Sequence, residues 1–141
     1  MAESIGLSDA TKAMKVFVYG TLRKGYGNHH LLRDATFLAE TQVKATMYSM
    51  GYIPYVSLSN DTNTVHGEVY KIDEDILRRL DQLEGYYPSQ PNTSFYNRSV
   101  IKTIDGHEAY IYHIEYKEEK DQYKVSSGDW KIYTQERDTQ R

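Results

Sequence analysis

Cysteine is absent from this 141-residue chain, and no apolar run approaches the roughly 18 to 20 residues of a membrane-spanning helix. Without cysteine the chain can form no disulfide bond, no thiol nucleophile and no thiolate zinc site. The first residues also lack the apolar core of a signal peptide. We therefore expect a cytoplasmic protein that does not contact a membrane. Basic residues number 17 against 20 acidic ones, and this net charge of −3 argues against a nucleic-acid-binding surface.

Motifs for metal binding and for hydrolase chemistry are missing as well. His29 and His30 are adjacent, and adjacent residues on a helix diverge by about 100°, so they cannot easily share a metal ion. The other histidines have no partner at ligand spacing. No G-x-S-x-G segment occurs, and Thr21 has no evident histidine base. The sequence therefore predicts neither a metal site nor a serine-type hydrolase.

The chain length corresponds to one domain that can bury a core without disulfides or metals. Residues 1–13 are small and polar with no sustained periodicity, which predicts a flexible N-terminal extension. Residues 14–141 are expected to form the single folded domain, which we expect to be a monomer.

Short runs of β-branched and aromatic residues predict most of the structure as strands. Asp105-Gly106 separates two of these runs and is typical of a hairpin turn, and Asn28 is placed to cap a short helix. Strands outnumber helices, so we expect an α+β fold: a mixed-strand β-barrel or strongly curled sheet of about five to seven strands with two main helices. The expected strands are residues 16–19, 43–50, 55–58, 65–72, 96–104 and 109–116.

The clearest helix is predicted over residues 74–84, with Asp73 as its N-cap and Gly85 as its stop. Four apolar residues form one stripe at helical spacing, and Glu84 lies within about 40° of that stripe. A carboxylate that faces an apolar interior has a raised pKa, which suits general acid/base catalysis. The alternative is a structural ion pair between Glu84 and a strand residue such as Arg98. The apolar stripe consists of Ile76, Leu77, Leu80 and Leu83.

The segment from Val16 to Gly25 predicts a strand that runs into a turn with exposed backbone amides. Gly20 can take a positive φ, and amides freed by such a turn can bind a carboxylate or phosphate without a cationic side chain. Gly20 and Gly25 have the spacing of a nucleotide-binding P-loop, but Tyr26 and Gly27 follow in place of its Lys and Ser/Thr. An ordinary strand-to-loop turn is the alternative.

The ordered set of motifs resembles the γ-glutamylcyclotransferase-like family, which includes γ-glutamylamine cyclotransferases and AIG2-like proteins. The resemblance covers roughly residues 14–133 in family order. The segments that carry it are Tyr19-Gly20-Thr21-Leu22-Arg23-Lys24-Gly25 with Asn28 and Leu31-Leu32, Gly51-Tyr52-Ile53-Pro54, Val65-His66-Gly67-Glu68-Val69-Tyr70, Leu80-Asp81-Gln82-Leu83-Glu84-Gly85-Tyr86, Tyr96-Asn97-Arg98 and Gly128-Asp129-Trp130.

This resemblance implies an intramolecular reaction that needs no cofactor: the α-amino group of a small γ-glutamyl substrate attacks its own γ-carbonyl, forms 5-oxoproline and expels an amine. Glu84 lies where the family carries its catalytic glutamate. By analogy, Glu84 moves the protons, while the amides of Gly20, Thr21 and Leu22 hold the substrate beside Tyr19. The leaving amine stays open among amino acids, polyamines, protein-derived lysine and specialised metabolites.

Four further residues are candidates for the pocket: Tyr55, Tyr86, Tyr96 and Arg98. Most of the 14 tyrosines are expected to be ordinary half-buried strand residues. Arg98 could bind a substrate carboxylate, although a structural ion pair is favoured. The alternative for the whole protein is a non-catalytic binding protein that uses the same turn to recognise a γ-glutamyl-like or other small anionic ligand. Retention of Glu84 favours the enzyme.

Overall fold

The computed structural model describes residues 14–116 and 120–139 of the chain. The expected N-terminal extension, residues 1–13, lies outside the described residues. The described elements, in chain order, are β1 (Met14–Val18), η1 (Gly27–Leu32), β2 (Thr36–Lys44), β3 (Thr46–Ser49), β4 (Pro54–Ser57), β5 (Thr64–Ile72), α2 (Glu74–Glu84), η2 (Pro91–Thr93), β6 (Asn97–Lys102), β7 (Glu108–His113), η3 (Asp121–Tyr123) and α3 (Trp130–Thr139).

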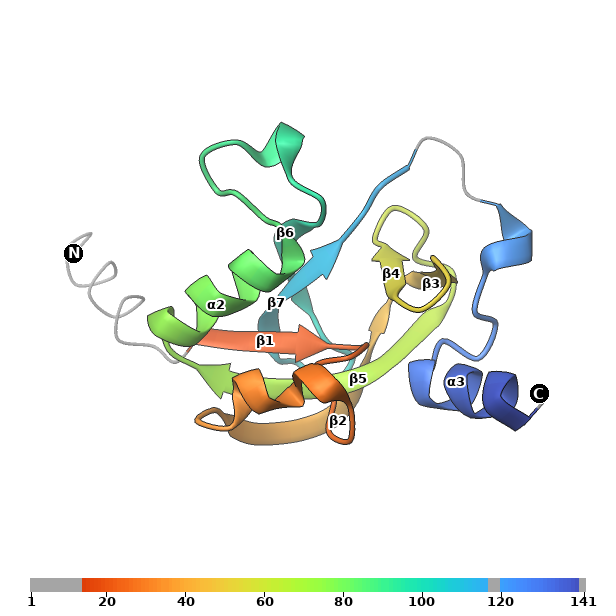
Figure 1. The fold of residues 1–141 in the computed structure, drawn as a ribbon, viewed down its shortest axis with the longest axis horizontal. Helices are drawn as coiled ribbons and strands as arrows, with labels where there is room; N and C mark the ends of the chain where they lie inside the picture. The colour runs from red at the N-terminus through yellow and green to blue at the C-terminus, as the bar shows by residue number, and fades with distance from the viewer. Residues whose placement is uncertain (1–13, 117–119, 140–141) are drawn as a thin grey trace.

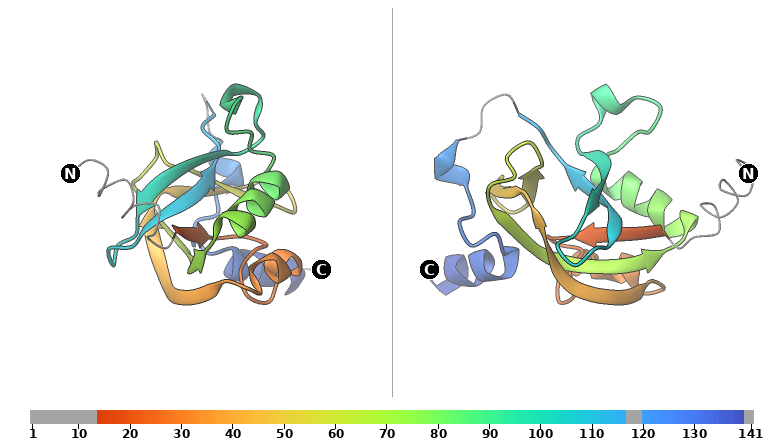
Figure 2. Two further views of the ribbon diagram at one scale, coloured as in Figure 1. Left: turned by 90° about the vertical axis from the view of Figure 1, so that its left-hand side faces the viewer. Right: turned by 180° about the vertical axis from the view of Figure 1, so that it is seen from behind.

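Five strands form a mixed sheet in the order β2-β5-β1-β7-β6, and β3 and β4 form a separate two-stranded sheet (Figure 1). The central strand β1 is antiparallel to β5 and parallel to β7. β2 and β5 are long, bent strands (Figure 2). The fold is therefore α+β with a mixed sheet, as predicted, and α2 and α3 are its two main helices.

The β3–β4 pair is joined to the main sheet by backbone hydrogen bonds. The Ile114 amide, just after β7, donates to the Val56 oxygen at 3.1 Å. The prediction of one strand over residues 43–50 was wrong, because the chain changes partner at Ala45: β2 pairs with β5 as far as Lys44, and β3 then pairs with β4. The β6–β7 hairpin is confirmed, with Gly106 at φ 95° in its turn.

Alternating residues of β1 build two apolar cores on opposite faces of the sheet. Val16 and Val18 pack with Ile76 and Leu80 of α2, which covers one face. Phe17 points to the other face and belongs to a core that also contains Trp130 and Ile111. This alternation is what period-2 side-chain geometry requires of a central strand buried on both faces.

Helix α2 has the predicted bounds and caps. The Asp73 carboxylate accepts a hydrogen bond from the Ile76 amide at 2.9 Å, and Gly85 ends the helix in the left-handed region at φ 65°. Ile76 and Leu80 are buried, whereas Leu83 is exposed. The C-terminal end of α2 therefore leaves the core, and it carries Glu84 toward the end of β1.

Candidate active site

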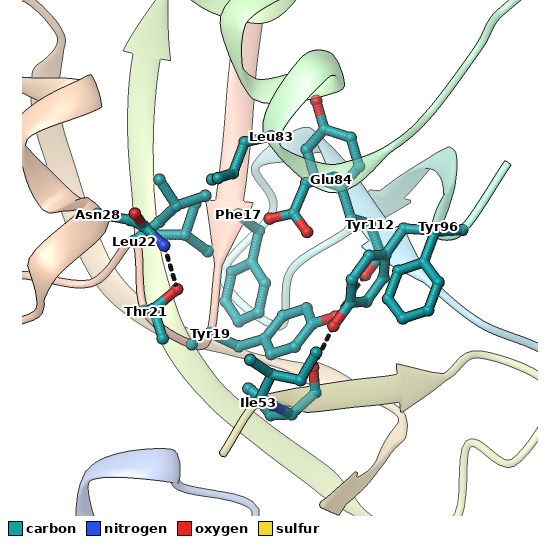
Figure 3. Close-up of a pocket in the computed structure, with 14 residues that line it drawn as sticks. Phe17, Tyr19, Thr21, Leu22, Asn28, Ile53, Leu83, Glu84, Tyr96 and Tyr112 are labelled. Atoms are coloured by element: carbon teal, nitrogen blue, oxygen red, sulfur yellow. Dashed lines mark hydrogen bonds between the residues drawn. The ribbon is translucent and has the colours of Figure 1, made fainter. Parts of the chain in front are cut away.

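A cavity of about 170 Å³ lies between the segment that follows β1 and the end of α2 (Figure 3). Six residues expected from the sequence line it: Tyr19, Gly20, Thr21, Leu22, Glu84 and Tyr96. The remaining lining residues are Phe17, Val18, Asn28, Ile53, Pro54, Leu83, Phe95 and Tyr112. The structure thus brings the predicted turn and the predicted carboxylate, far apart in sequence, into one cavity.

The turn after β1 lines this cavity with three residues whose backbone amides are unpaired among the residues that the structure describes. The Arg23 amide donates to the Gly20 oxygen at 3.0 Å and closes the turn. Within the described part of the chain, the amides of Gly20, Thr21 and Leu22 have no hydrogen-bond partner. Converging amides of this kind attract an anion or a developing oxyanion.

Helix η1 stabilises the turn after β1 through two hydrogen bonds from Asn28. The Asn28 side-chain amide donates to the Thr21 hydroxyl at 2.9 Å, and the Asn28 backbone amide donates to the Thr21 oxygen at 3.2 Å. The prediction that Asn28 caps a helix was wrong, because Asn28 lies inside η1 and the N-cap position is Tyr26. Its side chain supports the turn instead.

Gly20 is required for a different reason from the one predicted. Its φ is not positive, so the turn does not use the left-handed region at this position. A Cβ atom on Gly20 would lie 2.7 Å from Cγ of Pro54. The turn therefore approaches β4 so closely that only glycine leaves room.

A buried charge network fixes the other end of the turn. Arg23 and Glu68 are almost fully buried, and Nε of Arg23 lies 3.2 Å from Oε2 of Glu68. Oε1 of Glu68 accepts hydrogen bonds from the Lys24 amide and the Tyr70 hydroxyl. Burial alone would raise the pKa of Glu68, but these hydrogen bonds and Arg23 lower it below its usual range. Arg23 also binds Asp129, just before α3, at 2.9 Å.

Glu84 is the carboxylate of the cavity, and its side chain points into it (Figure 3). Burial raises the pKa of Glu84 to about 7. Among the described residues its carboxylate has no ion-pair or hydrogen-bond partner. A carboxyl group that titrates near neutrality and has no structural partner is suited to accept and return a proton.

Buried tyrosines form one wall, with their hydroxyls engaged by the protein. The Tyr19 hydroxyl donates to the backbone carbonyl oxygen of Tyr112 at 2.6 Å, and the Tyr96 hydroxyl donates to the backbone carbonyl oxygen of Pro54 at 2.6 Å. Burial, with Glu84 nearby, raises the pKa of both phenols. These tyrosines therefore stay neutral and shape the cavity.

Arg98 and Tyr86 do not line the cavity. The Arg98 guanidinium binds the Asp81 carboxylate at 2.5 Å and lies over the rings of Tyr86 and Tyr110. The predicted structural role of Arg98 is therefore what the structure shows, with Asp81 as its partner in place of Glu84.

Tyr55 lies in a different cavity. Its ring stacks on Tyr48 with the centroids 5.3 Å apart, and it faces a second cavity, of about 570 Å³, that Tyr116 and Lys124 also line. Tyr55 follows Pro54 on β4, and successive strand residues point to opposite faces. Pro54 therefore lines the first cavity, and Tyr55 lines the second.

Some lining residues were missed because their signal is weak in the sequence. Ile53 and Pro54 belong to a motif that carried the resemblance but received no role. Tyr112 had no signal, because only the register of β7 decides that it faces α2: its hydroxyl donates to Asp81 at 2.6 Å.

In the described ranges, no group of three or more histidine, aspartate or glutamate side chains is placed to hold a metal ion. No described helix is both long and apolar enough to span a membrane.

Comparison with known proteins places this chain in a family. The family model "Gamma-glutamyl cyclotransferase, AIG2-like" matches residues 16–132. The γ-glutamylcyclotransferase family protein YtfP of Escherichia coli K12 is 37% identical over 119 residues, which cover 83% of this chain and 96% of YtfP. The γ-L-glutamyl-butirosin B γ-glutamyl cyclotransferase of Niallia circulans is 28% identical over 119 residues, covering 84% of this chain and 76% of the relative.

A solved structure agrees with these relationships. A crystal structure of a Pyrococcus horikoshii protein superposes with a TM-score of 0.69 at 25% identity, covering 90% of this chain and 98% of the other. The fold is thus that of a small α+β protein, and the family model and the named relatives define its class as an enzyme that cyclises γ-glutamyl compounds. The chain belongs to the γ-glutamyl cyclotransferase, AIG2-like family.

Proposed function

We propose that this protein converts a γ-glutamyl amine or peptide into 5-oxoproline and a free amine, with Glu84 as the general acid/base. The observation that carries the proposal is that Glu84 lines the same cavity as the turn residues Gly20, Thr21 and Leu22. The relative from Niallia circulans, named for a γ-glutamyl substrate, supports the reaction class.

Substrate binding follows from the composition of the cavity. Among the residues that the structure describes, no lysine or arginine lines the cavity, so the glutamyl α-carboxylate or the polarised γ-carbonyl is held by the turn amides. The cavity has a volume of about 170 Å³, and its inner part, between the turn and Glu84, is taken to hold the glutamyl group. The leaving amine must therefore lie toward the opening.

Proton transfer by Glu84 completes the reaction. The ionised carboxylate takes a proton from the substrate α-ammonium group, and the freed amine attacks the γ-carbonyl carbon to close the five-membered ring. The bond from that carbon to the leaving nitrogen then breaks as Glu84 returns the proton to that nitrogen. The ring nitrogen still carries one proton too many, and it passes this proton through Glu84 to the released amine, which leaves as an ammonium ion. Atoms and protons balance without a cofactor and without a covalent enzyme intermediate. The enzyme contributes geometry, because ring closure requires the amine near the carbonyl.

We also propose a shape for the sheet, an oligomeric state and a cellular compartment. The bent main sheet and the β3–β4 pair are taken to form a partly closed barrel, because the Ile114 amide, just after β7, donates to the backbone oxygen of Val56 of β4 at 3.1 Å. We take the protein to be a monomer. The cysteine-free composition supports the cytoplasm as its compartment, and the net charge of −3 supports action on small molecules and not on nucleic acid.

A substrate panel tests the proposed function. The purified protein is incubated with γ-glutamyl amino acids, γ-glutamyl polyamines, γ-glutamyl-ε-lysine and simple γ-glutamyl alkylamides, and 5-oxoproline is measured by mass spectrometry. We expect 5-oxoproline from at least one member in amounts that match the released amine. Stoichiometric glutamate in place of 5-oxoproline would contradict cyclisation, and binding without any turnover would indicate a binding protein.

A further inference from the structure

The opening of the cavity carries three exposed apolar side chains that the proposed chemistry does not use. Ile53, Leu83 and Phe95 line the cavity and are 39%, 42% and 54% exposed. They come from three separate segments: the β3–β4 loop, the last turn of α2 and the segment before β6. Single exposed apolar residues are ordinary, but three that meet around one opening indicate a contact with a ligand.

Backbone hydrogen bonds hold these residues in place. The Phe95 amide donates to the Gly85 oxygen at 2.9 Å, and the Tyr96 amide donates to the Glu84 oxygen at 3.2 Å, so this segment is tied to the end of α2. The Phe95 ring packs edge-on against Tyr96 with the centroids 5.1 Å apart. Phe95 therefore has a defined position beside the carboxylate.

A backbone hydrogen bond also holds Ile53, which lies in the loop between β3 and β4. The Met50 amide donates to the Ile53 oxygen at 2.8 Å and closes the β3–β4 loop. The Arg137 guanidinium holds that loop through the Gly51 oxygen at 3.0 Å. Figure 3 shows Leu83 beside Glu84 on α2 and Ile53 beyond the Tyr19 ring. The apolar rim, defined as Ile53, Leu83 and Phe95, is thus built from anchored segments.

The rim faces the part of a substrate that the inner cavity does not hold. Proton return requires the leaving nitrogen to contact Glu84, so the first carbons of its substituent lie next to Leu83 and Phe95. Among the described residues that line the cavity, Glu84 is the single charged side chain, and proton transfer engages it with the reacting nitrogens, so no further group supplies a counter-ion for a charged leaving group. An ammonium or carboxylate there would lose hydration without gaining a partner.

From this geometry, and resting on the proposed function, we propose that the apolar rim selects γ-glutamyl amides of apolar amines, meaning amines whose carbons nearest the scissile nitrogen carry alkyl or aryl groups and no charge. Contact with an apolar rim favours a matched alkyl group over a charged one of the same size by about tenfold or more in kcat/KM. Amides of polyamines and of short acidic amines are the disfavoured class.

The test compares γ-glutamyl-n-butylamide with the γ-glutamyl monoamide of 1,3-diaminopropane, which replaces the terminal methyl by an ammonium group. γ-Glutamyl-β-alanine is the comparison compound with a negative charge. γ-Glutamylmethylamide is the reference compound, because its methyl group is too short to reach far along the rim. We expect the butylamide to exceed both charged amides by at least about tenfold in kcat/KM. Equal turnover of all the amides, or a preference for a charged one, would overturn the inference and leave the proposed function intact.

Matched variants assign the preference to the rim. Phe95→Ser should reduce the ratio of kcat/KM for the butylamide to kcat/KM for the diaminopropane amide by at least about threefold. Phe37→Ser is the control, because Phe37 is also 54% exposed and also packs edge-on against a tyrosine, Tyr70, away from the cavity. A ratio unchanged in Phe95→Ser and in Leu83→Ser would overturn the inference. An absence of 5-oxoproline from every amide, methylamide included, would contradict the proposed function and the inference together.

Discussion

Arg98 on β6 forms its ion pair with Asp81 of α2 and not with Glu84, one turn further along the same helix. Two carboxylates on one helix thereby receive different environments. Asp81 has a guanidinium and the Tyr112 hydroxyl as partners, whereas Glu84 faces the cavity. Such a difference in environment separates a structural carboxylate from one available for proton transfer.

The first prediction concerns the stability that Arg98 provides. Arg98→Met leaves Asp81 largely buried without its countercharge, and the free energy of unfolding should fall by about 1–3 kcal/mol. Urea denaturation followed by circular dichroism measures this change. Arg78→Met is the matched control, because the Arg78–Asp75 pair is exposed and should contribute less than about 1 kcal/mol. Equal losses in the two variants would contradict the structural role of Arg98.

The second prediction is the pH dependence of activity. The base must be ionised in the free enzyme, and burial raises the pKa of Glu84 to about 7. The value of kcat/KM should therefore rise tenfold per pH unit below about pH 7 and level off above it. Steady-state kinetics from pH 5 to pH 8 measure the profile. An acidic limb with its midpoint near pH 4.5 would mean that Glu84 is not the group that titrates.

The third prediction is that Glu84→Gln stabilises the folded protein, and that the size of this effect depends on pH. In the unfolded chain the carboxyl group ionises near its ordinary pKa, while the folded protein retains the proton up to about pH 7. The folded state thus binds more protons between these values, and the stability of the natural protein falls as the pH rises through this window.

Glu84→Gln removes that loss, so the variant should be more stable than the natural protein by about 1–3 kcal/mol at pH 8 and by much less at pH 4.5. Chemical denaturation at the two pH values measures the difference. A variant that is less stable than the natural protein at pH 8 would show that Glu84 has a stabilising partner.

The fourth prediction concerns the close approach of the turn to β4. In Gly20→Ala the new Cβ would lie 2.7 Å from the Pro54 ring, so the turn or the ring must move and the amides lose their alignment. We expect kcat/KM to fall by about tenfold or more, since small misplacements of binding groups are costly. Gly27→Ala is the control, because no atom lies within 4 Å of a Cβ there and its φ is not positive. Similar kinetics in the two variants would contradict the role of the turn.

Periodicity predicted α2 and the direction of Glu84 because helical spacing is fixed by backbone geometry. It did not predict the partner of Arg98, since Asp81 falls at the border of the apolar stripe and only the position of β6 decides which carboxylate the guanidinium reaches. The place of Tyr55 likewise depends on which face of β4 meets the cavity.

The start of β2 and the role of Asn28 were missed for local reasons. Residues 36–42 of β2 are mostly exposed or half-buried, so they lack the alternation that predicts a strand. Asn28 has the side chain of a helix cap, but the contact with Thr21 uses that amide. The turn amides were predictable because a strand followed by Gly20 indicates a sharp exit, although the physical need for glycine is the approach of Pro54.

The most direct measurement of the central claim is the rate of 5-oxoproline formation by Glu84→Gln at saturating substrate. Glutamine keeps nearly the volume of the side chain but cannot accept the ammonium proton, so kcat should fall by about 10² or more. Calorimetric titration with the same substrate should show affinity within a few-fold of the natural protein. Natural turnover by a folded Glu84→Gln protein would contradict proton transfer by Glu84.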